Sequence, residues 1–156
     1  MELSRDELAG VVDLFGALPP ADLVSAGEEL AYKRGTTFDG DNIDDAMTTY
    51  HLVRFGPDDG VVEGADEPLL AAGPAAFPVL PDGAEDLPHI FDREPVTPDR
   101  AALGTVVEER FRTDAARALG DGTGDIDRLL DTSYDIETWA PVDLGDIRDR
   151  LDAAAD

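Results

Sequence analysis

Apolar residues recur at helical spacing through the first third of the chain and predict three helices. Ser4 and Glu7 have the spacing of a capping box, which predicts a helix from residue 4 to Gly16. A second helix is predicted from about Pro20 to a stop at Gly35, and a third over residues 41–50. The predicted inward faces are Leu8, Val11, Val12 and Phe15, then Leu23, Gly27, Leu30 and Ala31, then Ile43, Ala46, Met47 and Tyr50.

The pattern then changes to that of a small antiparallel hairpin. The stretch 51-HLVRF-55 is typical of a strand, 56-GPDDG-60 of a turn, and 68-PLLAAGP-74 of a returning strand. Three helices followed by a hairpin is the order of elements in a winged-helix domain. We therefore expect residues 1–80 to form a winged-helix-like part, although this order also occurs in proteins that do not bind DNA.

Proline residues interrupt the pattern between the hairpin and the next helix. Residues 75–98, and 81–97 in particular, predict an irregular crossover with at most a short helix over 86–92. Apolar side chains within the crossover predict that it packs onto the fold. These side chains are Phe77, Val79, Leu80, Ile90 and Phe91.

Residues 98–156 predict three more helices. The first opens at Thr97–Pro98–Asp99, with Thr97 as the N-cap, and runs to Gly120. The second starts near Ile126 and ends before Pro141, and the last covers residues 144–151. Their apolar stripes are Leu103, Val107, Phe111, Ala115 and Ala118, then Ile126, Leu129, Leu130 and Tyr134, then Leu144, Ile147 and Leu151. The predicted fold class is mainly α (α+β), with this helical part packed on the first in one compact domain.

The net charge of the chain indicates the kind of environment in which the protein works. The 156 residues carry 36 acidic and 12 basic side chains, a net charge of −24, and only Lys33 among the bases is a lysine. Residues 1–80 contain 4 basic and 16 acidic side chains, and residues 81–156 contain 8 basic and 20 acidic ones. Each part therefore contributes −12 to the net charge. An even spread argues against an acidic tail or a nucleic-acid mimic and favours adaptation to high salt, where screening removes the self-repulsion. We expect a halophilic cytoplasm.

Other features of the composition exclude whole classes of protein. The chain has no cysteine, which rules out disulfides, thiolate metal sites and cysteine nucleophiles. Apolar runs stay far shorter than a membrane span, and the acidic N-terminus has no signal-peptide pattern. A cytoplasmic protein is expected.

The amino-acid sequence of four stretches resembles that of an uncharacterised haloarchaeal family, a domain of unknown function. The resemblance covers most of the chain. The four stretches are 6-DELAGVVDLFGAL-18, 29-ELAYKRG-35, 73-GPAAFPVLP-81 and 129-LLDTSYDIETWAPVDLGDIRDRLD-152. The resemblance implies a halophilic source and a winged-helix-like start. It implies no activity, substrate or site residue.

Binding to nucleic acid requires basic side chains that neutralise phosphates. The third helix, where a winged-helix protein reads DNA, offers Asn42 but no Lys or Arg. The candidate nucleic-acid contacts are therefore Lys33, Arg34 and Arg54. The competing interpretation is that Lys33 and Arg34 complement the negative end of a helix dipole.

The sequence contains no stretch that matches a known metal-binding or catalytic motif well. The stretches 39-DGDNIDD-45 and 121-DGTGDID-127 do not match a calcium loop, and we interpret their acids as turn and cap residues. His51 and His89 are too few for a transition-metal site without carboxylates, and no nucleophile elbow, phosphate loop or dinucleotide motif is present. We expect no enzyme, no cofactor and no metal.

Large aromatic and arginine side chains of the C-terminal part are the remaining candidates. Tyr134, Trp139 and Arg112 have the residue types that dominate protein interfaces, and a partner is most simply a protein. The competing interpretation is internal, with Trp139 between the last two helices and the arginines paired with Glu108, Glu109 and Asp114. The sequence predicts a non-enzymatic interaction or regulatory protein. The alternative is a DNA-associated winged-helix transcriptional regulator.

Overall fold

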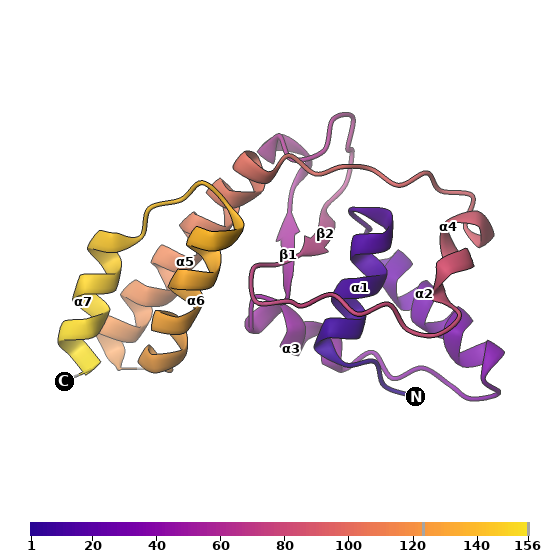
Figure 1. The fold of residues 1–156 in the computed structure, drawn as a ribbon, viewed down its shortest axis with the longest axis horizontal. Coiled ribbons are helices and arrows are strands. Elements are labelled where there is room, and N and C mark those ends of the chain that lie inside the picture. Colours follow the sequence, from indigo (N-terminus) through magenta and orange to yellow (C-terminus); the bar gives the residue numbers. More distant parts are fainter. Residues whose placement is uncertain (123, 156) are drawn as a thin grey trace. The chain divides into compact units, whose positions relative to one another are not determined.

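The computed structural model describes residues 1–122 and 124–155, which form two compact units, Met1–Pro98 and Asp99–Asp156. The described residues are mainly helical and contain one small antiparallel sheet (Figure 1), which confirms the predicted α+β class. The net charge is −16 for the first unit, from 5 bases and 21 acids, and −8 for the second, from 7 and 15. That the second unit packs on the first stays a prediction.

The first unit begins with α1 (Arg5–Phe15), α2 (Pro20–Lys33) and α3 (Asn42–Thr48). The capping box is confirmed, because the Glu7 N–H donates to Ser4 Oγ and the Ser4 N–H donates to Glu7 Oε1, both at 3.0 Å. All of the predicted inward side chains of these helices are buried except Met47, which is half-buried. Burial of these apolar faces forms the core of the unit.

The end of α2 confirms the predicted stop at Gly35. Gly35 has a φ of +69°, its N–H donates to the Tyr32 carbonyl at 3.1 Å, and the Thr36 N–H donates to the Ala31 carbonyl at 2.9 Å. These paired bonds are a Schellman motif, which glycine favours because it adopts a left-handed conformation without steric cost.

The third helix is shorter than predicted. It ends at Thr48, and Tyr50 has a φ of +64°, outside the helix that was expected to run to residue 50. Tyr50 is nevertheless only 3% exposed, so the chain reverses here while keeping the ring in the core. Gly73 lies against this reversal, where an added Cβ would stand 2.3 Å from the Tyr50 carbonyl oxygen.

The hairpin follows, with β1 (Leu52–Phe55) and β2 (Leu69–Ala72) paired antiparallel so that Leu52 faces Ala72. Leu18, in the connection between α1 and α2, exchanges both backbone hydrogen bonds with Leu70, at 3.0 and 2.7 Å. The order of elements is therefore the predicted one, three helices and a hairpin. Likeness to a winged helix stays a prediction.

The crossover after the hairpin differs from its prediction in one respect. A short 3-10 turn (Ala84–Asp86) and α4 (Leu87–Ile90) confirm the brief helix, and Phe91 is half-buried against the core. The segment packs as predicted, since the Val79 N–H donates to the Asp6 carbonyl of α1 at 3.0 Å, but the other four apolar side chains are exposed. The exposed fractions are 81% for Phe77, 50% for Val79, 42% for Leu80 and 42% for Ile90.

The second unit consists of α5 (Arg100–Asp121), α6 (Ile126–Trp139) and α7 (Gly145–Ala155), which contact one another pairwise. The predicted N-cap Thr97 is wrong, since Asp99 caps α5 by accepting from the N–H groups of Ala101 and Ala102 at 3.0 and 3.2 Å. The helix also passes Gly120 and stops at Gly122, whose φ is +71°. The predicted stripes of α5 and of the last helix are buried.

The predicted stripe of α6 is wrong in its final member. Tyr134 is 58% exposed, and the buried face instead continues from Leu129 through Thr132 and Ser133 to Ile136. The hydroxyls of Thr132 and Ser133 form hydrogen bonds within their own helix. Thr132 Oγ1 donates to the Arg128 carbonyl at 2.9 Å, and Ser133 Oγ donates to the Leu130 carbonyl at 2.6 Å. Polar residues bonded in this way can occupy a core position.

Candidate functional site

The outer face of α3 is acidic. Ile43 and Ala46 point inward, while Asp44, Asp45 and Thr48 are exposed. Asn42, whose amide could read a base in the manner of a winged-helix protein, instead donates from Nδ2 to the Leu3 carbonyl at 2.8 Å. The long connection over residues 56–68, between the two strands of the hairpin, contains five acids and no base. Phosphates would meet repulsion at both elements.

The three candidate nucleic-acid contacts lie in two places. Lys33 Nζ donates to the Gly83 carbonyl at 3.4 Å, and Arg34 donates to the Asp82 carbonyl at 3.1 Å. Both side chains thus join the end of α2 to the crossover, while Arg54 lies on the exposed side of β1. The contacts of Lys33 and Arg34 do not connect them to Arg54.

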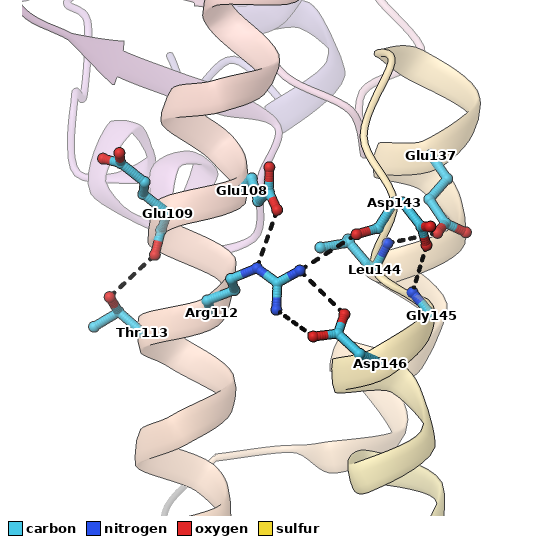
Figure 2. A network of polar contacts seen from close by, with 9 residues as sticks. All are labelled: Glu108, Glu109, Arg112, Thr113, Glu137, Asp143, Leu144, Gly145 and Asp146. Carbon is cyan, nitrogen blue, oxygen red and sulfur yellow. Dashed lines mark hydrogen bonds and ion pairs between the residues drawn. The ribbon is translucent and has the colours of Figure 1, made fainter.

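Arg112 joins α5 to α7 and to the connection that precedes α7 (Figure 2). Its Nε donates to Glu108 Oε2 at 3.0 Å, its two terminal nitrogens donate to the two Asp146 oxygens at 3.1 Å each, and Nη2 reaches the Asp143 carbonyl at 3.3 Å. The hydrogen bonds that Arg112 donates to Asp146 and then to Glu108 raise the pKa of Arg112, and the same guanidinium lowers the pKa of Asp146. The arrangement gives Arg112 an internal role.

Tyr134 lies under a second arginine. The Arg148 guanidinium carbon is 4.3 Å from the centre of the Tyr134 ring, and Arg148 Nη1 donates to Glu137 Oε1 at 2.7 Å. The other oxygen of Glu137 accepts the Leu144 N–H at 2.8 Å, at the start of α7. The bonds from Arg148 and then from Leu144 lower the pKa of Glu137, and the carboxylate raises the pKa of Arg148.

Trp139 has an equivalent partner. The Arg100 guanidinium carbon lies 4.4 Å from the Trp139 ring centre, and Arg100 also approaches the Trp139 carbonyl at 3.5 Å. Trp139 is half-buried at the end of α6. The three candidate interface residues therefore each contact a charged side chain of their own unit, and Glu108 is the one predicted internal partner that Arg112 contacts, although more than half of the Tyr134 side chain remains accessible.

A feature that the sequence analysis missed is the exposed segment of residues 77–80, the apolar strap. Its backbone lies on α1, because the Phe77 N–H donates to Asp6 Oδ1 and the Val79 N–H to the Asp6 carbonyl, both at 3.0 Å. Gly10 permits this approach, since an added Cβ would stand 2.0 Å from the Val79 oxygen. A glycine on the buried face of a predicted helix was the available signal, because it marks close backbone contact.

A second missed feature is a groove beside the C-terminal half of α2, the aromatic groove. It has a volume of about 600 Å³. Its lining combines the carboxylates Glu28 and Glu29 with the rings of Tyr32, Phe38 and Phe91. Tyr32 is 80% exposed at the rim.

A chain of polar groups beside the strap resembles a catalytic triad only in residue type. Thr49 Oγ1 lies 2.8 Å from His51 Nδ1, and His51 Nε2 lies 3.7 Å from Asp6 Oδ1. The Thr49 hydroxyl also has the Asp45 carbonyl at 2.9 Å and the Ala46 carbonyl at 3.3 Å as acceptors, whereas a threonine nucleophile needs its proton directed to the imidazole. In the part of the chain that the structure describes, no three His, Asp or Glu side chains converge as a metal site.

The fold and these surfaces define a mainly helical α+β protein with two accessible features, an apolar strap and an aromatic groove bordered by carboxylates. The chain belongs to a family of unknown function, DUF7109, whose family model matches residues 6–156. No curated protein and no solved structure matches the chain. Over residues 1–122 and 124–155, no helix has the length and hydropathy needed to cross a bilayer.

Proposed function

We propose that this protein is a non-enzymatic interaction or regulatory protein of a halophilic cytoplasm, and that it binds a partner protein through the apolar strap. The observation that carries the proposal is the exposure of Phe77, Val79 and Leu80 on a backbone fixed to α1. Contiguous exposed apolar side chains on a soluble protein typically mark an interaction site.

The fixed backbone of the strap strengthens the proposal. Binding a mobile segment costs conformational entropy, and this cost is lower when the segment is already ordered. Two backbone hydrogen bonds to Asp6, together with the close approach at Gly10, keep the strap in one place while its side chains face outward. A preorganised apolar edge of this kind suits a protein partner with a complementary apolar surface.

The salt-rich environment follows from the distribution of charge. Both units are strongly acidic, and both would repel themselves in dilute buffer. Contacts between apolar side chains persist in molar salt, whereas contacts between exposed charges are screened there. An apolar strap is thus a suitable binding element for a protein that works under such conditions.

The alternative, a DNA-associated winged-helix regulator, rests on the order of the elements. It has less support, because the outer face of α3 carries Asp44 and Asp45. Lys33 and Arg34 are also bonded to the crossover.

The experiment is a comparative pull-down in molar KCl from lysate of the source organism, with and without nuclease. Val79→Ser and Phe77→Ser alter the strap, and Val24→Ser on α2 is the matched control, since Val24 is also an exposed valine. We expect a partner that survives nuclease, is lost with the strap variants and is retained by Val24→Ser. Equal recovery by all variants contradicts a role of the strap. Loss of the partner on nuclease treatment favours the DNA-associated alternative.

A further inference from the structure

The aromatic groove of the first unit has the composition of a site for a cation. Two of its three rings, those of Phe38 and Phe91, are held by the core, since the Phe38 ring rests on Gly27, where an added Cβ would stand 2.6 Å from three ring carbons. The Phe91 ring lies 6.4 Å from the ring of the buried Phe15. The groove therefore keeps fixed aromatic walls beside two carboxylates.

The second unit shows how this chain binds a guanidinium with the same groups. On α6, Tyr134 and Glu137 are three residues apart and share a face, and together they hold Arg148, 4.3 Å above the ring and 2.7 Å from the carboxylate. On α2, Glu29 and Tyr32 are likewise three residues apart, and Glu28 is four residues from Tyr32. The same two residue types thus share a face of α2, in the reverse order along the helix.

On α2 this pair lacks an internal arginine. Among the described residues, neither Glu28 nor Glu29 has a salt bridge, and no arginine lies over the Tyr32 ring. Tyr32 is instead 80% exposed. The net charge of −16 on this unit attracts cations and repels phosphates and carboxylates.

We propose that the aromatic groove binds an arginine side chain presented by a partner protein. The planar guanidinium stacks on Tyr32, and its N–H groups donate to Glu28 and Glu29, while Phe38 and Phe91 cover its apolar stem. Arginine fits better than lysine, because a guanidinium is weakly hydrated, stacks on rings and pairs with carboxylates in a fixed geometry. These properties matter most in molar salt, where a point charge alone is screened.

This inference rests on the proposed function only in assigning the arginine to a protein, because strap and groove are formed by different residues. If the strap variants lose the partner while the groove still binds arginine, the two surfaces act independently. Failure of the strap in the pull-down therefore leaves the groove testable by itself.

The test is an NMR titration of the intact ¹⁵N-labelled chain in molar KCl with blocked Gly-Arg-Gly, Gly-Lys-Gly and Gly-citrulline-Gly tripeptides. Citrulline keeps the shape of arginine without its charge. We expect saturable amide shifts around Tyr32 and Phe38 with the arginine peptide, binding weaker by about threefold or more with lysine, and none with citrulline. The variants Tyr32→Ala and Glu29→Gln should weaken arginine binding about tenfold.

Two further variants decide whether the effect is specific. Tyr32→Phe keeps the ring and should retain binding, and Glu63→Gln makes the same charge change outside the groove and should have no effect. Equal binding of citrulline and arginine, or unchanged binding by Tyr32→Ala, overturns the proposal. Absence of a saturable shift in the wild-type protein overturns it as well.

Discussion

Arg112 of α5 and Asp146 of α7 meet through two parallel hydrogen bonds of 3.1 Å each, and Arg112 simultaneously holds Glu108 of its own helix. Figure 2 shows the guanidinium between the two helices, with the Asp143 carbonyl as a further acceptor. A fork of this geometry is specific for arginine, because lysine presents a single point charge. The pair therefore fixes the position of α7 against α5.

Replacement of Arg112 should loosen the second unit. We expect Arg112→Ala to lower the free energy of unfolding by about 1 kcal/mol, a value kept small because the side chain is 36% exposed and screened by solvent. Arg112→Lys should recover less than half of the loss. Urea unfolding in molar KCl measures the effect.

The matched control for Arg112 is Arg150→Ala, which removes an exposed arginine of α7 that has no ion pair among the described residues. This control should be close to wild type. Equal destabilisation by both alanine variants would mean that general charge, and not the Arg112 fork, is responsible.

Glu137 should give the second unit a specific dependence on pH. Its carboxylate accepts from Arg148 and from the Leu144 N–H, and these bonds lower its pKa in the folded state. A lowered folded-state pKa contributes stability above the unfolded-state pKa of about 4.3, and the contribution is lost as the pH falls through the folded-state pKa. Glu137→Gln should therefore cost about 1 kcal/mol near pH 7 and progressively less below about pH 4.3.

The measurement for Glu137 is the difference in unfolding free energy between variant and wild type, followed over that pH range. Taking the difference removes the shared effect of the many other carboxylates. If the difference in unfolding free energy stays constant from neutral to acid pH, the ionised form of Glu137 does not contribute to the stability of the folded state.

Gly10 should be intolerant of any side chain. An added Cβ would stand 2.0 Å from the Val79 oxygen, so Gly10→Ala must displace the strap, and we expect a loss of about 1–3 kcal/mol. Gly120→Ala is the matched control, because nothing lies within 4 Å of its added Cβ near the end of α5. That control should be neutral or stabilise by up to about 1 kcal/mol. Similar melting temperatures for both variants would contradict the close contact of strap and helix.

Stability should rise with salt. A net charge of −24 repels itself, and the Debye length falls from about 10 Å to about 3 Å between about 0.1 M and 1 M salt. We expect the urea midpoint to increase over this range of KCl. Neutralising Glu63, Asp66 and Glu67, which are exposed in the hairpin connection, should make the dependence shallower. A midpoint that falls with KCl would contradict adaptation to high salt.

The helices and the hairpin were predictable because their signals are local. The capping box at Ser4 and the stop at Gly35 depend on residues within one turn of the helix end, and both are confirmed. The cap of α5 was misplaced by two residues, because Thr97 and Asp99 are both good caps and only the folded chain selects between them.

The candidate surfaces were harder to predict because they depend on which atoms of a segment meet the core. Tyr134 was assigned to a buried stripe, yet Thr132 and Ser133 occupy that face with their hydroxyls bonded to the preceding turn. The apolar side chains of the crossover predicted that the segment packs onto the fold, yet the Phe77 ring is exposed and it is the Phe77 N–H that bonds to Asp6 of α1. Hydropathy alone does not distinguish these cases, since it records the side chain and not the bonding of the main chain.

The strap has a consequence for how the protein avoids self-association. An extended apolar segment with free N–H groups along its outer edge can add another chain as a β-strand and seed aggregation. The inward donors here are those of Phe77 and Val79, both bonded to Asp6. Pro78, between them, has no N–H to offer on the opposite edge. The segment can thus expose hydrophobic side chains while offering at most the N–H of Leu80 on that edge, so it lacks the row of donors on which another copy could align.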